Sequence, residues 1–99
     1  MRPTQLIYSR KAGRELQSLE RYIAKRESKE IAAAYIERIQ SRCERILQAP
    51  LQGTRRDYIR PNLRTTGFEK RVTIAFRVTE TTVRILSIAY GGRRYESDL

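Results

Sequence analysis

The sequence predicts an α+β domain in which a helical hairpin packs on one face of a mainly antiparallel four-stranded sheet. Three observations lead to this prediction. Two apolar stripes with helical spacing fill residues 9–48, apolar and polar residues alternate from residue 63 onward, and a short strand-like segment precedes both patterns. The predicted order is β-α-α-β-β-β, and two packed layers would bury the apolar face of each element.

The first predicted strand covers residues 4–8, with Leu6 and Tyr8 on one face. Ser9 can then cap a helix, because its hydroxyl accepts a hydrogen bond from a free backbone N–H of the first turn. The apolar stripe of this helix consists of Ala12, Leu16, Leu19 and Ile23. The polar residues between them are expected to fill the outer surface of the helix: Lys11, Arg14, Glu15, Gln17, Ser18 and Arg21.

A polar break at residues 25–28 separates the two helices, and Ser28 is a second capping residue. The second helix is predicted to run to about Gln48, before Pro50 ends it. Its stripe consists of Ala32, Ile36, Ile39, Cys43 and Ile46. Because the break is short, we expect an antiparallel hairpin in which the stripes face each other and form core.

The second half of the chain has the period of strands. Residues 52–62 contain Gly53 and Pro61 and are predicted to form a loop, a short strand begins at residues 63–65, and residues 67–70 mark a turn. Residues 72–78 alternate between apolar and polar side chains, as in a half-buried strand. After a turn at residues 79–82, residues 83–90 become apolar on both faces, which is typical of a central strand.

Length and charge bound the class of protein. Because 99 residues is the size of one domain, residues 1–99 are expected to form a single domain. The 21 Lys and Arg residues against 11 Asp and Glu residues give a net charge of +10. A chain this basic is attracted to nucleic acid, an anionic membrane or an acidic protein. No apolar run is long enough to span a bilayer and no signal-peptide core follows Met1, so we expect a cytoplasmic protein that does not associate with membranes.

Few catalytic arrangements remain possible. The chain has no histidine, which excludes Ser-His-Asp and Cys-His sites, and no Cys/His cluster could hold zinc. The single cysteine, Cys43, lies in an apolar stripe, where a small buried side chain is expected. No phosphate-binding loop or carboxylate pair suggests a cofactor or acid–base catalysis, so we predict neither a cofactor nor a metal.

The remaining signal is a group of basic residues interleaved with aromatic ones in the second half of the chain. The basic residues are Arg55, Arg56, Arg60, Arg64, Lys70, Arg71, Arg77, Arg84, Arg93 and Arg94, and the aromatic ones are Tyr58, Phe68, Tyr90 and Tyr95. Such a surface could bind RNA through phosphate contacts and stacking. It could cleave RNA, with arginine stabilising the developing charge. It could instead dock an acidic protein, with arginine and tyrosine as anchors.

Four sequence pieces in order resemble the ParE toxins, which are often labelled plasmid-stabilisation proteins, over about residues 6–96. The first is YSRKAGREL at residues 8–16, continued by LERYIA at 19–24. The others are ILQAPLQG at residues 46–53, IRPNLR at 59–64, and VRILSIAYGGRRYE at 83–96. The resemblance implies the RelE/ParE-like fold, which agrees with the predicted β-α-α-β-β-β order.

The resemblance also implies a function. ParE proteins are toxins of toxin–antitoxin pairs that poison DNA gyrase by binding and are neutralised by a small acidic antitoxin of the ParD type. Operator DNA would be contacted only through the antitoxin. The residues expected to contact the target are Arg93, Arg94 and Tyr95, with Arg64 and Arg60 as weaker candidates. Those expected to contact the antitoxin are Leu16, Leu19, Tyr22, Ile23 and Arg77.

Two alternatives stay open. RelE-type members of the same fold cut messenger RNA on the ribosome, and here Tyr90, Arg77 and Lys70 would form the chemical set. Lys70 is the only lysine after Lys29, so the several lysines of those nucleases are missing. The second alternative is a basic nucleic-acid-binding module, which the charge permits.

Overall fold

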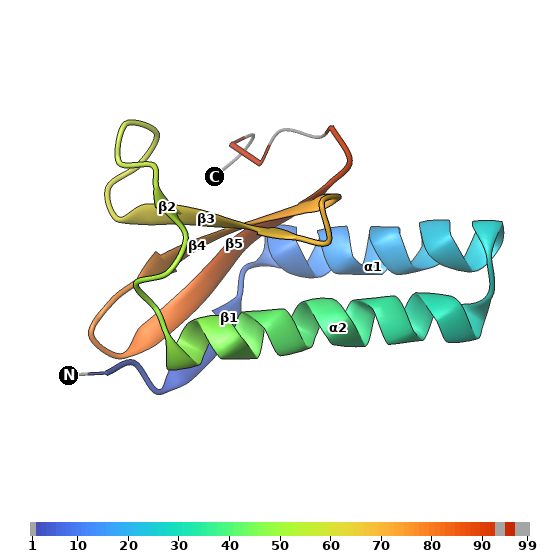
Figure 1. Cartoon of the computed structure of the whole chain (residues 1–99), viewed down its shortest axis with the longest axis horizontal. Helices are drawn as coiled ribbons and strands as arrows, with labels where there is room; N and C mark the ends of the chain where they lie inside the picture. Colours follow the sequence, from blue (N-terminus) through green and yellow to red (C-terminus); the bar gives the residue numbers. More distant parts are fainter. Residues whose placement is uncertain (1, 93–94, 97–99) are drawn as a thin grey trace.

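Two helices cover one face of a five-stranded sheet (Figure 1). The computed structural model describes residues 2–92 and 95–96. The elements in chain order are β1 (Gln5–Tyr8), α1 (Arg10–Arg26), α2 (Lys29–Gln48), β2 (Thr54–Arg55), β3 (Leu63–Phe68), β4 (Val72–Val78) and β5 (Thr82–Tyr90). The strand order is β1-β5-β4-β3-β2, in which β1 and β5 are parallel and the other pairs antiparallel. The α+β class and the mainly antiparallel sheet are confirmed.

The helix ends lie where the sequence places them. The Ser9 hydroxyl accepts a hydrogen bond from the Ala12 N–H at 3.1 Å, and the Ser28 hydroxyl accepts one from the Ile31 N–H at 3.1 Å. Each bond satisfies one of the free N–H groups of a first helical turn. Both stripes face the core, although Ile23 near the end of α1 is only partly buried.

The main core lies between the helices and the sheet. It joins the two helical stripes to the inward side chains of β4 and β5, among them the fully buried Phe76 and Ile85. A smaller cluster lies on the opposite, open face of the sheet and consists of Leu63, Ala75 and Leu86. Ala75 is therefore buried, whereas the alternating pattern placed it among the polar residues of its strand.

The predicted sheet lacked one strand. Residues 52–62 were expected to form a loop, but Thr54 and Arg55 pair with Thr65 and Arg64 and add β2 to the edge of the sheet. Two residues are too few to produce a period-two pattern, which explains the omission. Gly53 leads into this strand with φ +84, and a Cβ there would lie 2.5 Å from the Thr65 carbonyl oxygen, so glycine is required.

Two further local features differ from the expected pattern. Strand β3 continues to Phe68, so the turn begins at Glu69 and Lys70, which have φ values of 47 and 65. The register between β4 and β5 shifts after Ala75, because Ala75 pairs with Ser87 while Phe76 pairs with Ile85. Leu86 is the extra residue of this bulge, and its side chain joins the cluster on the open face.

Cys43 gives a direct test of the helix-to-sheet core. It is fully buried, and burial raises the pKa of its thiol from 9.0 to about 11. We expect a thiol reagent at pH 8 to label Cys43 only after unfolding, because the thiolate is the reactive form. The raised pKa means that the fold favours the neutral thiol. The contribution of Cys43 to the free energy of unfolding is therefore fully present below pH 9 and is lost as the pH rises through about 11. Equal labelling rates for folded and urea-unfolded protein would contradict this packing.

Candidate functional site

A groove lies between α1 and β5. Its volume is about 420 Å³. It is lined by Glu15, Ser18, Leu19, Tyr22, Ile88, Tyr90 and Gly92. The lining is mainly apolar and aromatic and includes one carboxylate, that of Glu15. This composition is typical of a surface that binds a segment of another protein.

A second groove of about 450 Å³ lies at the hairpin end of the helices. It is lined by Tyr22, Ile23, Arg26, Glu27, Ile31, Tyr35, Arg38, Glu69, Arg71 and Tyr90. Three of these side chains form an aromatic cluster, in which the Tyr90 ring centre lies 6.0 Å from that of Tyr22 and 6.5 Å from that of Tyr35. Tyr22 and Tyr90 line both grooves, so the two hollows form one continuous surface, named here the Tyr22 surface.

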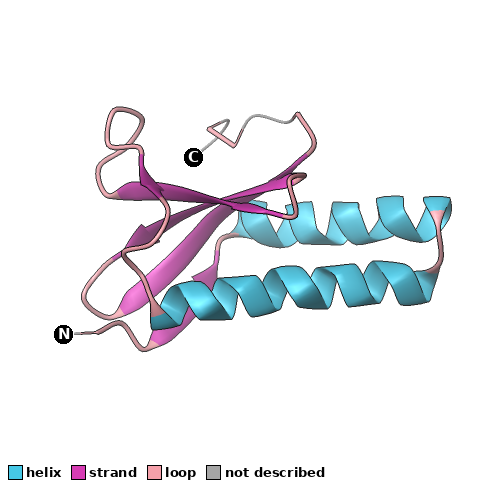
Figure 2. Cartoon of the chain, viewed as in Figure 1, coloured by secondary structure: helices cyan, strands magenta, loops and turns pink. Residues whose placement is uncertain are grey.

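The Tyr22 surface is exposed because the helices are longer than the sheet. Both helices extend beyond the ends of the strands, and within the part of the chain that the structure describes no strand covers their far ends (Figure 2). Tyr22 is 48% exposed and Ile31 51% exposed, although both are large apolar or aromatic side chains. An apolar patch bordered by charged residues is typical of a protein interaction site.

Cationic side chains stack on two of the tyrosines of this surface. The Arg26 guanidinium lies 5.4 Å from the Tyr22 ring centre, and that of Arg38 lies 5.1 Å from the Tyr35 ring centre. Arg38 also forms an ion pair with Glu69 at 3.0 Å. The buried Tyr35 hydroxyl has no hydrogen-bond partner among the described residues. Burial, followed by the neighbouring Tyr90 and Glu69, raises the pKa of Tyr35.

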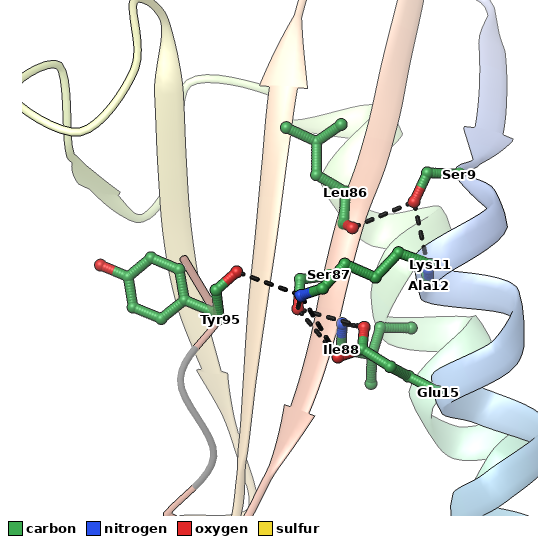
Figure 3. A network of polar contacts seen from close by, with 8 residues as sticks. All are labelled: Ser9, Lys11, Ala12, Glu15, Leu86, Ser87, Ile88 and Tyr95. Atoms are coloured by element: carbon green, nitrogen blue, oxygen red, sulfur yellow. Dashed lines mark hydrogen bonds and ion pairs between the residues drawn. The ribbon is translucent and has the colours of Figure 1, made fainter. Parts of the chain in front are cut away.

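A polar network joins α1 to the edge of β5 (Figure 3). The Lys11 ammonium donates hydrogen bonds to the Ser87 hydroxyl at 3.0 Å and to the Tyr95 carbonyl oxygen at 3.3 Å. It also lies 3.5 Å from the Glu15 carboxylate, and the side chains of this pair are each 17% exposed. Lys11 and Glu15 were expected on the outer surface of the helix, and that expectation is wrong.

The open face of the sheet carries a second group of arginines. Arg77 pairs across the strands with Leu63 and Arg84, so two like charges lie directly opposite each other. The Arg77 Nε is buried and has no hydrogen-bond partner among the described residues. The Arg56 Nε donates to the Thr65 hydroxyl at 3.1 Å. Because Arg77 follows the core residue Phe76 in β4, its side chain lies on the opposite side of the sheet from the helices.

Tyr95 reaches the same open face. Its ring packs against the small cluster of Leu63, Ala75 and Leu86. Burial raises the pKa of Tyr95, and the nearby Arg56 guanidinium partly offsets this effect. Tyr95 thus lies over the open face of the sheet, five residues after β5 ends at Tyr90.

The residues expected to contact the target are not gathered on one surface. Arg93 and Arg94 lie outside the described residues. Arg64 lies on the helix side of β3 and donates to the Leu51 carbonyl oxygen at 2.9 Å, whereas Tyr95 lies on the open face. Arg60 is half-buried in the turn before β3, where its carbonyl oxygen accepts from the Leu63 N–H at 3.1 Å.

The residues expected to contact the antitoxin also lie in different parts of the molecule. Tyr22, Ile23 and Leu19 line the Tyr22 surface, with Leu19 at its buried base. Leu16 is part of the main core and presents little surface to a partner. Arg77 lies on the other side of the sheet.

The alternative nuclease set is dispersed as well. Tyr90 packs on the helix side, while Arg77 lies on the open face. The pairing partner of Tyr90 is Val72, five residues before Arg77, which places their backbones about 17 Å apart along the sheet. Lys70 lies in the turn between β3 and β4.

Among the described residues, no group of three or more His, Cys, Asp or Glu side chains is placed to hold a metal ion. Neither helix has the length and hydropathy of a membrane span.

Sequence reasoning missed the network around Ser87. This serine is fully buried within β5, and its hydroxyl donates to Glu15 at 3.1 Å. Two signals were present in the sequence. Lys11 and Glu15 are spaced as an i,i+4 ion pair, and Ser87 is a single hydroxyl within an otherwise apolar strand.

Comparisons with known proteins agree with this architecture. Residues 6–95 match the family model described as the ParE toxin of the type II toxin–antitoxin system, parDE. A solved structure described as the chromosomal ParDE TA system from P. aeruginosa matches with a TM-score of 0.77 and 25% sequence identity, covering 89% of this chain and 96% of that chain. Curated protein sequences gave no match. Because the family model covers most of the chain, this protein belongs to the ParE toxin family of type II toxin–antitoxin systems.

Proposed function

We propose that residues 1–99 act as a single-domain cytoplasmic toxin that inhibits DNA gyrase by binding, without catalysing a reaction, and that a ParD-type antitoxin neutralises it. The observation that carries this proposal is the Tyr22 surface. It is a continuous pair of grooves with large apolar side chains exposed at its rim. The dispersal of Tyr90, Arg77 and Lys70 favours binding over ribonuclease chemistry, because general acid–base catalysis needs groups within hydrogen-bond reach of one substrate.

The antitoxin is proposed to occupy the Tyr22 surface. A small domain that is marginally stable alone gains from a partner that covers exposed aromatic side chains. The net charge of +10 would steer an acidic antitoxin segment to this protein. Leu19, Tyr22 and Ile23 would supply apolar contacts, and Arg26 and Arg71 at the margin would meet its carboxylates. Operator DNA would then be reached only through the antitoxin.

The gyrase contact is proposed to involve the C-terminal segment, with Arg93, Arg94 and Tyr95 as its main residues. Arg60 and Arg64 remain weaker candidates, because the Arg64 guanidinium already bonds the chain between α2 and β2. Tyr95 is held on the open face beside Arg56, which leaves the Tyr22 surface free for a different partner. Target and antitoxin would therefore use different parts of the molecule.

A supercoiling assay tests the proposal. Purified protein added to gyrase and relaxed plasmid should block supercoiling or trap cleaved DNA, and prior incubation with the antitoxin should restore the reaction. The antitoxin would be the product of the adjacent reading frame, and the control is the same protein after heat denaturation. Cleavage of messenger RNA on ribosomes with gyrase unaffected would contradict the proposal and favour the nuclease alternative. Tight binding to bare DNA or RNA without effect on gyrase would favour a nucleic-acid-binding module.

A further inference from the structure

We propose that Lys11 and Glu15 are positioning residues that fix the C-terminal segment at Tyr95 for its contact with gyrase. The inference rests on the proposed function, because it assumes that this segment touches the target. The contacts that hold Tyr95 do not depend on that assumption. The network in Figure 3 ties a residue of the C-terminal segment to the first turns of α1, more than 80 positions earlier in the chain.

The first step concerns the edge of β5. Strand β1 pairs with β5 only as far as Tyr8 and Ile85, so among residues 2–92 and 95–96 no strand lies beside the following residues of β5 on that edge. The start of α1 takes its place. The Ser9 hydroxyl donates to the Leu86 carbonyl oxygen at 3.0 Å, and the Glu15 carboxylate accepts from the Ile88 N–H at 2.8 Å. Side chains of α1 thus satisfy backbone groups that a neighbouring strand would otherwise bond.

The second step is the orientation of Lys11. A lysine ammonium has three N–H donors, and here three acceptors surround it: the Ser87 hydroxyl, the Glu15 carboxylate and the Tyr95 carbonyl oxygen. Glu15 is itself held by the Ile88 N–H and by the Ser87 hydroxyl. Because the pair is largely removed from water, its charge-assisted hydrogen bonds are stronger than those of an exposed pair. The ammonium is therefore held where it can bond Tyr95.

The third step concerns the chain between β5 and Tyr95. Gly91 follows the end of β5 with φ +67, and Gly92 comes next, so the start of this connection has unusual backbone freedom. Tyr95 is nevertheless fixed at two points, its ring on the Leu63 cluster and its carbonyl oxygen on Lys11. Because Tyr95 is held before binding, it loses less freedom on binding, which favours affinity for the target.

The test uses the full chain and the variant Lys11→Met, which keeps most of the apolar side chain and removes the donors. Lys25→Met is the matched control, because Lys25 is an exposed lysine on the same helix. We expect the NMR order parameter of the Tyr95 amide to fall from about 0.85 to below about 0.6 in Lys11→Met and to stay unchanged in the control. The concentration needed to half-inhibit gyrase should rise roughly tenfold, as a lost charge-assisted hydrogen bond would cause.

Two further measurements separate positioning from general damage. Lys11 lines neither groove of the Tyr22 surface, so antitoxin affinity should stay within about twofold of that of the unchanged protein. Lys11→Arg, which keeps the charge and the donors, should restore most of the gyrase inhibition. If Lys11→Met does not fold, Glu15→Gln replaces it, because the amide oxygen can still accept from Ile88 while the ion pair is lost. The same fall in the Tyr95 order parameter is expected.

The possible failures are distinguishable. A rigid Tyr95 amide in Lys11→Met would overturn the positioning role, whatever the gyrase result. A mobile Tyr95 amide in Lys11→Met with unchanged gyrase inhibition would show that Lys11 fixes Tyr95. It would overturn the proposal that this fixation matters for the gyrase contact. Failure of the unchanged protein to inhibit gyrase would contradict the proposed function, and the order parameters would still report on the tether.

Discussion

Phe76→Ala is expected to lower the free energy of unfolding by about 3–5 kcal/mol. Phe76 is fully buried, and it is the largest side chain among the fully buried residues. It lies on the central strand β4, between β3 and β5, and points into the core beneath the helices. Removing the ring leaves a cavity that the surrounding side chains fill only in part.

The consequence is large because the domain is small. Proteins of this size are stable by only about 5–15 kcal/mol, and each kcal/mol lost lowers the melting temperature by about 4–8 °C. Urea unfolding followed by circular dichroism would measure the change as a lower midpoint at an unchanged slope. Tyr58→Ala is the matched control, since this ring is 77% exposed and its loss should cost less than about 0.5 kcal/mol. A Phe76→Ala protein within 1 kcal/mol of the unchanged one would be inconsistent with a core centred on this ring.

The helices were predictable because the signals that define them are local. Ser9 and Ser28 bond N–H groups three residues further along the chain, and the stripes repeat within one helix. The long strands were predictable for a similar reason, since the alternation of β4 and the apolar run of β5 are each visible within seven to nine residues. Strand β2 was not, because its pairing with β3 is a contact between segments about ten residues apart and leaves no pattern of its own.

The main error of the sequence-based prediction was the environment of charged side chains. The cause is again that the deciding contacts join segments far apart in the chain. A helical pattern assigns every charged residue between apolar ones to solvent. Lys11 and Glu15 instead face β5, because the strand beside them lacks a partner and offers free backbone groups. Arg77 was grouped with residues of α1 as an expected antitoxin contact, but the period of β4 places it on the side of Leu63 and away from Phe76. The pattern of a strand shows which residues share a face of the sheet. It does not show which of the two faces the helices will cover.

Tyr22→Ala is expected to weaken antitoxin binding by at least 2 kcal/mol, about 30-fold in Kd. The Tyr22 ring lies between the two grooves, 6.0 Å from the Tyr90 ring centre and 5.4 Å from the Arg26 guanidinium. A partner that fills both grooves must cover this ring, and exposed aromatic residues at the centre of an interface supply much of its binding energy. Isothermal titration of the purified variant with the antitoxin would measure the change.

Stability and affinity should separate in this variant. Since Tyr22 is 48% exposed, its truncation should lower the free energy of unfolding by less than about 1.5 kcal/mol, so the protein remains folded during the titration. Tyr58→Ala again serves as the control, because Tyr58 is an exposed tyrosine that lines neither groove, and its antitoxin affinity should be unchanged. If Tyr22→Ala and Tyr58→Ala bound the antitoxin equally well, the antitoxin would have to lie elsewhere on the molecule. The open face with Arg77 and Arg84 would then be the next surface to test, because two guanidinium groups held opposite each other are stabilised by an acidic partner.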